Sequence, residues 1–188
     1  MPSSMGMSRG ISETADAERW KHHLFSVGDR AVYPAQGILQ IVGIEEREIH
    51  GKVCSFYLLE VASSGLRILV PVDKASHVGL RPVANPTDIE EALAILKEER
   101  PAAERRGPSW NRRYRGFLDK VKSGSLFEIA EVLRDLHHLR KQKTLSFGER
   151  RMMDTARGLF IQELSASRLV DEGTAGAELD GALSPPGV

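Results

Sequence analysis

Apolar and polar residues follow different spacings in the two halves of the chain. Between residues 25 and 83, short runs rich in β-branched side chains are separated by turns that contain Gly, Pro or Asp, as strands and their connections prefer. The pattern predicts strands over residues 31–33, 38–49, 53–61 and 66–70, with a hairpin turn at His50 and Gly51. Short strands with frequent turns favour a small β-barrel or a strongly bent sheet.

From residue 85 onward, the apolar residues recur at the three- and four-residue spacing of helices. We expect capping boxes at three helix starts, which pair Thr87 with Glu90, Ser125 with Glu128 and Ser146 with Glu149. A further helix is expected between Ser109, a favourable N-cap residue, and Gly124, which ends it. The helical pattern stops near Val170, because the residues after it are rich in Gly, Ala, Glu and Pro.

These patterns predict an α+β chain with two domains and two tails. A small β-domain occupies residues 25–83, and an all-α domain occupies residues 84–170, with a linker at about residues 100–108 where proline and glycine gather. Residues 1–24 are expected to form a flexible extension, and residues 171–188 a flexible acidic tail.

The formal net charge of zero conceals a strongly basic segment. Residues 101–157 hold 14 Lys and Arg against 7 Asp and Glu, whereas residues 25–100 hold 8 against 11. Such asymmetry indicates two surfaces with different partners, although an ordinary solvated helical face has a similar composition.

The composition fits a soluble cytoplasmic protein. Hydrophobic residues make up 41% of the chain, which is enough for packed cores. No apolar run is long enough to cross a membrane, and the first twenty residues lack the apolar segment of a signal peptide. Because Cys54 is the single cysteine, no intramolecular disulfide can form, as suits a reducing compartment.

The sequence patterns that carry catalysis or cofactor binding are absent. The chain lacks the phosphate-binding loop, the dinucleotide-binding fingerprint and the nucleophile-elbow motif. The adjacent histidine pairs at 22–23 and 137–138 point about 100° apart on a helix, so neither pair is a natural chelate. Cys54 falls within a strand as a small buried apolar residue. We therefore expect no catalytic, cofactor-binding or metal-binding residues; the alternative is an enzyme whose groups converge only in space.

The strongest chemical signal is the segment Ser-Trp-Asn-Arg-Arg-Tyr-Arg at residues 109–115. Its tryptophan falls in the first turn of a helix, where backbone amides and the helix dipole favour phosphate oxygens. Arg112, Arg113 and Arg115 can neutralise phosphates, and an exposed Trp110 indole offers a face for a base or a wedge between base steps. The residues alone fit a structural role equally well, in which Trp110 fills the space between the domains and the arginines pair with acids.

A second basic set lies between two predicted helices. Lys141 and Lys143 fall at the end of one helix, and Phe147, Arg150 and Arg151 fall at the start of the next. The lysines complement the negative end of a helix, so capping is one role for them. If the two helix ends converge, the same residues form a corner that grips phosphate.

Two segments of the β-half also stand out. Residues 33–37, Tyr-Pro-Ala-Gln-Gly, form a tight aromatic turn whose residue types follow from turn geometry. Residues 45–48, Glu-Glu-Arg-Glu, place charge along a strand. Such charge blunts a sheet edge, and an edge can also recruit a partner strand through backbone pairing.

Six segments in this order resemble the CarD/CdnL family of bacterial transcription regulators, and the resemblance spans residues 25–169. In the β-half they are F-S-V-G-D-R-A-V-Y-P-A-Q-G at 25–37, R-I-L-V-P at 67–71 and V-G-L-R at 78–81. In the helical half they are W-N-R-R-Y-R at 110–115, F-E-I-A-E-V-L-R-D-L at 127–136 and L-S-F-G-E-R-R-M at 145–152. The first segment alone is less specific, because the polymerase-binding module of transcription-repair coupling factors shares its fold.

The resemblance implies an SH3/Tudor-like β-domain that binds the RNA polymerase β subunit. The polymerase contacts would lie on the strands around Arg47, Glu48, Ile49, Leu69 and Pro71. Since Leu69 stands where some relatives carry a cation, we expect a more hydrophobic polymerase contact in this chain.

For the helical domain, the resemblance implies contact with promoter DNA. Trp110 would meet the upstream edge of the segment that melts and so stabilise the open complex formed with the housekeeping sigma factor. Arg112 and Arg113 would grip the DNA backbone beside it. No reading helix is needed, because tethering to polymerase confines the contact to promoters.

We therefore hypothesise a non-enzymatic, monomeric regulator in the cytoplasm that associates with the nucleoid and needs no cofactor or membrane. Its expected DNA-binding residues are Trp110, Arg112, Arg113, Arg115, Lys141, Lys143, Phe147, Arg150 and Arg151. The alternative is a protein-interaction adaptor that binds polymerase through the β-domain while its basic helices bind another acidic protein.

Overall fold

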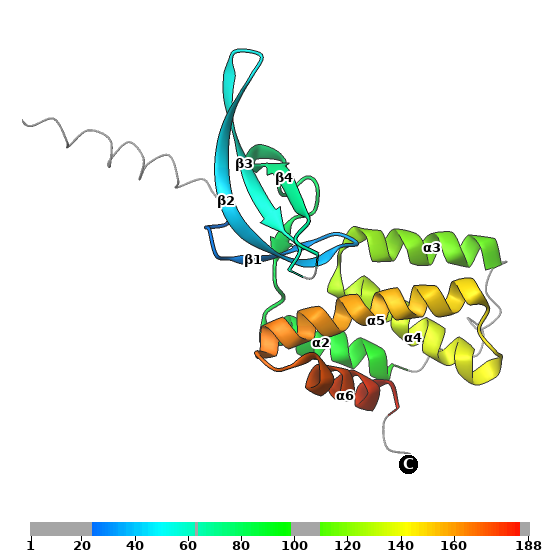
Figure 1. Cartoon of the computed structure of the whole chain (residues 1–188). Coiled ribbons are helices and arrows are strands. Elements are labelled where there is room, and N and C mark those ends of the chain that lie inside the picture. The colour runs from blue at the N-terminus through cyan, green and yellow to red at the C-terminus, as the bar shows by residue number, and fades with distance from the viewer. Residues whose placement is uncertain (1–23, 63, 99–109, 185–188) are drawn as a thin grey trace, which may run out of the picture.

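The computed structural model describes residues 24–62, 64–98 and 110–184, and for residues 110–112 it describes the backbone only. Within these residues, a five-stranded antiparallel sheet is followed by five α-helices. The predicted α+β class is confirmed, with the sheet at one end of the helical bundle (Figure 1). The predicted flexible extension, except for Leu24, and the linker at about residues 100–108 lie outside the described residues.

The strands lie in the order β4-β3-β2-β1-β5, and all described pairings are antiparallel. Their bounds are β1 Arg30–Tyr33, β2 Gly37–Ile49, β3 Lys52–Glu60, β4 Arg67–Pro71 and β5 Arg81–Pro82. The long β2 pairs with β1 through its first residues and with β3 over the rest, and its register shifts between Ile41 and Gly43. Such a shift bends a strand, so the sheet curls around its core; no described pairing joins β5 back to β4.

The β2–β3 hairpin turns where the sequence predicts. His50 and Gly51 have φ angles of 50° and 75°, as a two-residue turn of this hand requires. The hairpin stands away from the rest of the sheet (Figure 1) and exposes Ile49 and Val53 near its tip.

One face of the sheet holds the core of the β-domain. Tyr57 and Leu59 of β3 are fully buried on this face, together with Ile41 of β2. The Tyr57 hydroxyl accepts a hydrogen bond of 3.2 Å from the backbone N–H of Phe25, whose ring packs edge-on against Tyr57. Because side chains alternate along a strand, residues 54, 56 and 58 of β3 point to the opposite face.

The helices are α2 Pro86–Lys97, α3 Trp110–Ser123, α4 Leu126–Gln142, α5 Phe147–Arg168 and α6 Glu172–Leu183. Their apolar faces share one core, in which Leu133, Leu136 and Phe160 are completely buried. Gly124 ends α3 with a φ of 74°, as predicted, whereas the Ser109 cap lies outside the described residues.

The helix caps agree only partly with the predicted capping boxes. The box at Ser146 and Glu149 is confirmed. The box at Thr87 is wrong, because Asn85 caps α2 and exchanges hydrogen bonds with Asp88, so the helix starts two residues earlier. At α4, Ser125 accepts from the Glu128 N–H as predicted, but its own N–H donates to the Ser123 hydroxyl.

The prediction of a flexible tail after Val170 is wrong for residues 172–183, which form α6. Asp171 caps this helix, and Ala175, Leu179, Ala182 and Leu183 are buried in the helical core. Small residues let α6 approach α2 and α5 closely, so a segment of modest hydrophobicity still buries a complete face.

Candidate nucleic-acid and polymerase interfaces

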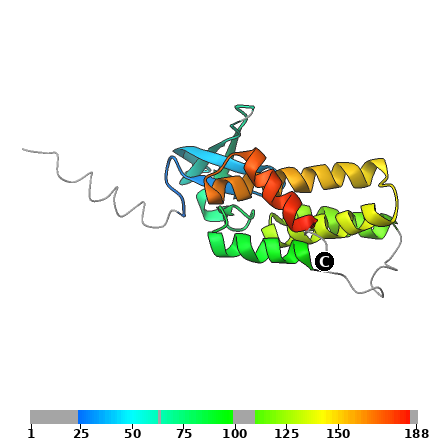
Figure 2. The same cartoon turned by 90° about the horizontal axis from the view of Figure 1, so that it is seen from below.

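Three helix ends meet at the end of the bundle that lies farthest from the sheet (Figure 1, Figure 2). They are the start of α3, the end of α4 and the start of α5, and the three helices pack on one another. The fold therefore brings together the two basic segments. We name this surface the distal basic end and define it by the backbone of residues 110–112 and the side chains of Arg113, Arg115, Lys141, Lys143, Phe147, Arg150 and Arg151.

The helix dipoles reinforce the charge of the distal basic end. α3 and α5 both start there, and the start of a helix carries about half a positive charge on its unpaired amides. α4 ends there, and Arg140 and Lys141 in its last turn offset its negative end. The surface therefore favours an anionic partner.

The position of Trp110 argues against a role between the domains. It is the first residue of α3, a helix of 14 residues that is roughly 20 Å long. The contact with the β-domain lies at the other end of α3, where Arg81 binds the carbonyl oxygen of Gly124. The side chains of Trp110 and Arg112 lie outside the described residues, so the exposure of the indole stays a prediction.

The next two arginines of α3 are free of acidic partners in the described part of the chain. Arg115 is exposed, and Arg113 is half-buried. The buried Nε of Arg113 lacks a hydrogen-bond partner among the described residues. A phosphate oxygen cannot reach this buried atom, so the exposed Arg115 is the better-placed phosphate ligand of the two.

Phe147 is the most conspicuous apolar side chain of the distal basic end, with 73% of it exposed. It is the first residue of α5, and Arg150 and Arg151 lie exposed in the same and the following turn. Neither arginine forms an ion pair with another described residue. An aromatic ring beside free guanidinium groups is the combination expected at a nucleic-acid surface.

Lys143 differs from its neighbours because it has an internal partner. Its ammonium group lies 3.0 Å from the Glu149 carboxylate, which is 1% exposed and also accepts from the Ser146 N–H. Lys143 therefore neutralises a buried acid, whereas Lys141 is exposed. Burial raises the pKa of Glu149, but the hydrogen bonds from Ser146 and Lys143 outweigh this, and the net shift is downward.

Glu149→Gln should lower the stability of the α4–α5 corner at neutral pH and reduce its sensitivity to acid. Because the folded-state pKa lies below the ordinary glutamate value, the carboxylate stabilises the fold above that value and loses this effect as pH falls through the folded pKa. Urea unfolding at pH 7 and below about pH 4 checks this. An unchanged difference between the two pH values in the variant would contradict it.

Four of the five predicted polymerase-binding residues share one face of the sheet. Arg47 pairs across strands with Cys54, Leu69 with Leu58, and Pro71 with Phe56. Cross-strand partners point to the same side, and Ile49 lies two residues beyond Arg47 on that side. We name this surface the outer sheet face and define it by Arg47, Ile49, Cys54, Phe56, Leu58, Leu69 and Pro71. Glu48 points to the opposite face, where it pairs with Val53.

The centre of the outer sheet face comes from β3, which the sequence analysis did not single out. Cys54, Phe56 and Leu58 are half-buried and belong to neither hydrophobic core. The prediction that Cys54 is a buried residue is therefore wrong, because its side chain is only partly buried. The apolar residues at alternate positions 54, 56 and 58 were the available signal. β4, beside them, is an edge strand of the described sheet.

Within the described residues, no group of three or more His, Cys, Asp or Glu side chains is placed to hold a metal ion. His137 is buried, and burial followed by the charges of Lys141 and Arg140 lowers its pKa, so it does not add to the positive charge at neutral pH. None of the described helices combines the length and apolar character that a bilayer span requires.

Two family models match nearly all of the described chain. Residues 25–84 match the CarD-like/TRCF RID domain, and residues 91–180 match the C-terminal domain of CarD. The first match covers the sheet up to the start of α2. The second covers the helical bundle except for the first residues of α2 and the last residues of α6.

The chain is also similar to two named proteins. It is 33% identical over 149 residues to the putative transcription factor YdeB of Bacillus subtilis, which covers 79% of this chain and 95% of YdeB. It is 46% identical to the solved structure of CdnLNt from Myxococcus xanthus, with a TM-score of 0.28 over 31% of this chain and 83% of that chain.

Proposed function

The chain belongs to the CarD/CdnL family of transcription factors, and from this premise we propose that it joins RNA polymerase to promoter DNA through two separate surfaces. The outer sheet face binds the β subunit of the polymerase. The distal basic end contacts DNA at the upstream edge of the melted region and stabilises the open complex formed with the housekeeping sigma factor. The proposed regulator acts in the cytoplasm, on the nucleoid, as a monomer without enzymatic activity.

One observation carries the DNA half of the proposal. The two basic segments, 110–115 and 141–151, lie together at the distal basic end although α4 separates them in the sequence. Cations gathered at helix starts bind phosphate without reading base sequence, and Phe147 adds an exposed ring. Such a surface suits a fork, where melting exposes unstacked bases beside two phosphate backbones.

Tethering supplies the selectivity that this surface lacks. A cationic end with an aromatic ring would bind any duplex weakly, because most of its contacts are to phosphate. Attachment to polymerase raises its effective concentration at promoters only. The separation of the strands of the outer sheet face from the distal basic end supports this arrangement (Figure 1).

The apolar centre of the outer sheet face supports the polymerase half. Phe56, Leu58 and Leu69 form a contiguous cross-strand patch, and Arg47 lies beside them with Glu45 as its neighbour at 2.8 Å. An exposed ion pair of this kind contributes little to stability, so Arg47 can exchange Glu45 for a partner carboxylate at small cost. Because position 69 holds a leucine and not a cation, the patch is more apolar.

Footprinting of promoter DNA in the complex with polymerase holoenzyme tests the proposal. We expect added protection directly upstream of the melted region, together with capture of a polymerase β fragment by the immobilised protein. Capture of the fragment without added DNA protection would favour the adaptor that binds an acidic protein instead. Failure to capture the fragment would overturn the polymerase half.

Arg151→Ala should weaken the salt dependence of DNA binding. If Arg151 neutralises one phosphate, its loss lowers the slope of log K against log salt concentration by about 0.9. Arg157→Ala is the matched control on the same helix, because Arg157 already pairs with Asp180 at 2.5 Å. Titration of fluorescent duplex at several salt concentrations measures both slopes, and equal slopes for the two variants would contradict the assignment.

A further inference from the structure

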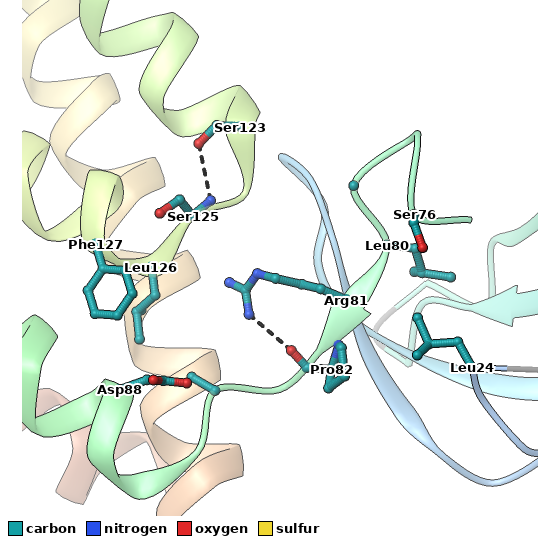
Figure 3. A pocket seen from close by; sticks show the side chains of 12 residues that line it. Leu24, Ser76, Leu80, Arg81, Pro82, Asp88, Ser123, Ser125, Leu126 and Phe127 are labelled. Atoms are coloured by element: carbon teal, nitrogen blue, oxygen red, sulfur yellow. Dashed lines mark hydrogen bonds between the residues drawn. The ribbon is translucent and has the colours of Figure 1, made fainter. Parts of the chain in front are cut away.

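We propose that Arg81 is a positioning residue that holds the distal basic end in a fixed orientation relative to the outer sheet face. The inference rests on the proposed function and says how the two binding surfaces keep a fixed relative orientation. Arg81 lies in β5, the last strand, and its side chain reaches across to the start of α4 (Figure 3).

The Arg81 guanidinium uses all of its hydrogen-bond donors at the junction of the domains. Nη1 and Nη2 donate to the two carboxylate oxygens of Glu163 in α5, at 2.5 and 2.9 Å. Nε and Nη2 donate to the Gly124 carbonyl between α3 and α4, at 3.0 and 2.6 Å, and Nη1 also donates to the Pro82 carbonyl. One rigid, planar group therefore connects the sheet with α5 and with the turn between α3 and α4.

Glu163 completes the connection from the helical side. Its side chain is 3% exposed, and Oε1 also accepts from the Ala84 N–H at 2.9 Å, between β5 and α2. The paired charges are thus fully hydrogen-bonded with defined geometry. A buried charged network of this kind restricts the arrangements that its partners can adopt more than apolar contact does.

Arg81 and Glu163 form the cluster of short hydrogen bonds at this junction, and Arg30 adds a longer one of 3.4 Å to the Ala166 carbonyl. On one side of Arg81, an open cavity of about 500 Å³ lies between the domains, with Leu24, Leu80 and Phe127 in its lining (Figure 3). On the other side, the 33–37 turn packs on the helices: Pro34 lies against Gly124, and Gly37 lies against Leu159 and Gln162. The chain between β5 and α2 is only three residues long, but three residues still allow rotation.

The relative orientation of the two domains determines where the distal basic end meets the DNA. With the outer sheet face held on polymerase, the distal basic end reaches one place on the DNA only if the domains do not rotate against each other. Loss of the Arg81–Glu163 pair should therefore leave each surface intact but lower the effective concentration of the basic end at the fork.

The test uses the full chain with Arg81→Met and Glu163→Met together, so that no unpaired charge remains buried. We expect unchanged affinity for the polymerase β fragment and an open-complex lifetime shortened by about tenfold. Because the domains rotate against each other, small-angle scattering should give a broader distribution of interatomic distances, which we call broader scattering. An unchanged lifetime despite broader scattering would overturn the proposal.

A matched double variant separates positioning from the general effect of losing an ion pair. Arg168 and Glu90 pair at 2.6 Å between α5 and α2, inside the helical bundle. We compare the double Met variant with Arg168→Met and Glu90→Met together. The control should keep the scattering and the lifetime of the unmutated protein to within about twofold. A control that shortens the lifetime as much as the double Met variant does would overturn the proposal.

The same measurements distinguish this inference from the proposed function. If the unmutated protein does not prolong the open complex, the proposed function fails. The small-angle scattering measurement then tests by itself whether Arg81 fixes the orientation of the domains. A broader distance distribution in the double Met variant, but not in the Arg168→Met and Glu90→Met control, would still support it. Scattering identical to that of the unmutated protein would overturn it.

Discussion

Trp110→Ala should shorten the lifetime of the promoter open complex by roughly tenfold or more. Loss of one base-stacking ring costs about 1–3 kcal/mol, which corresponds to about 5- to 150-fold in the rate at which the complex decays. The start of α3 at the distal basic end, roughly 20 Å from the junction with the sheet, is the basis for this expectation. Decay of preformed complexes after addition of a competitor measures the lifetime.

Two further variants show whether the effect belongs to the ring. Trp110→Phe keeps an aromatic face and should recover most of the lifetime. Leu169→Ala removes a side chain that is 81% exposed at the opposite end of α5, and it should change nothing. Binding of the β fragment and thermal unfolding should be unaffected in all three. A normal lifetime with folded Trp110→Ala would show that the indole does not stabilise the open complex.

Arg81→Met alone should destabilise the protein by about 3–5 kcal/mol, because it leaves the buried Glu163 carboxylate without its cation. Ala84 N–H would remain as its described hydrogen-bond donor, which is too little to stabilise a charge at that depth. Urea unfolding at pH 7 gives the loss.

The second Met substitution should reverse most of that loss. With Glu163→Met added, no charge is left buried, and stability should return to within about 2 kcal/mol of the unmutated protein. The remaining deficit reflects the hydrogen bonds lost by the Gly124 carbonyl and the Ala84 N–H. Arg67→Met is the control, since Arg67 pairs with Glu60 at an exposed site and should cost less than about 1 kcal/mol. Additive effects of the two Met substitutions would contradict a coupled pair.

Several local features were predictable because their determinants lie within a few residues. The His50–Gly51 turn, the Ser146 cap and the end of α3 at Gly124 are all as expected. At α2, the same reasoning chose Thr87 over Asn85, because two adjacent segments both carry capping residues and only the folded backbone decides between them.

The C-terminal helix shows where local reasoning stops. Residues 172–183 are rich in glycine and alanine, and by composition alone they would not bury enough surface to be stable. They fold because α2 and α5 together present a surface that accepts small side chains, whereas the exposed pair of Asp180 and Arg157 contributes little. The shape of that surface cannot be read from the segment itself.

The sequence by itself determined the α+β class, the principal strands and helices, and the residue types of two cationic segments. The tertiary structure alone decided that these segments share one end of the bundle and that Lys143 pairs with a buried carboxylate. It alone revealed the pair of Arg81 and Glu163, which are 82 positions apart. The physical reason is range: capping and periodicity act over a few residues, whereas burial and charge pairing depend on which distant faces the packing brings into contact.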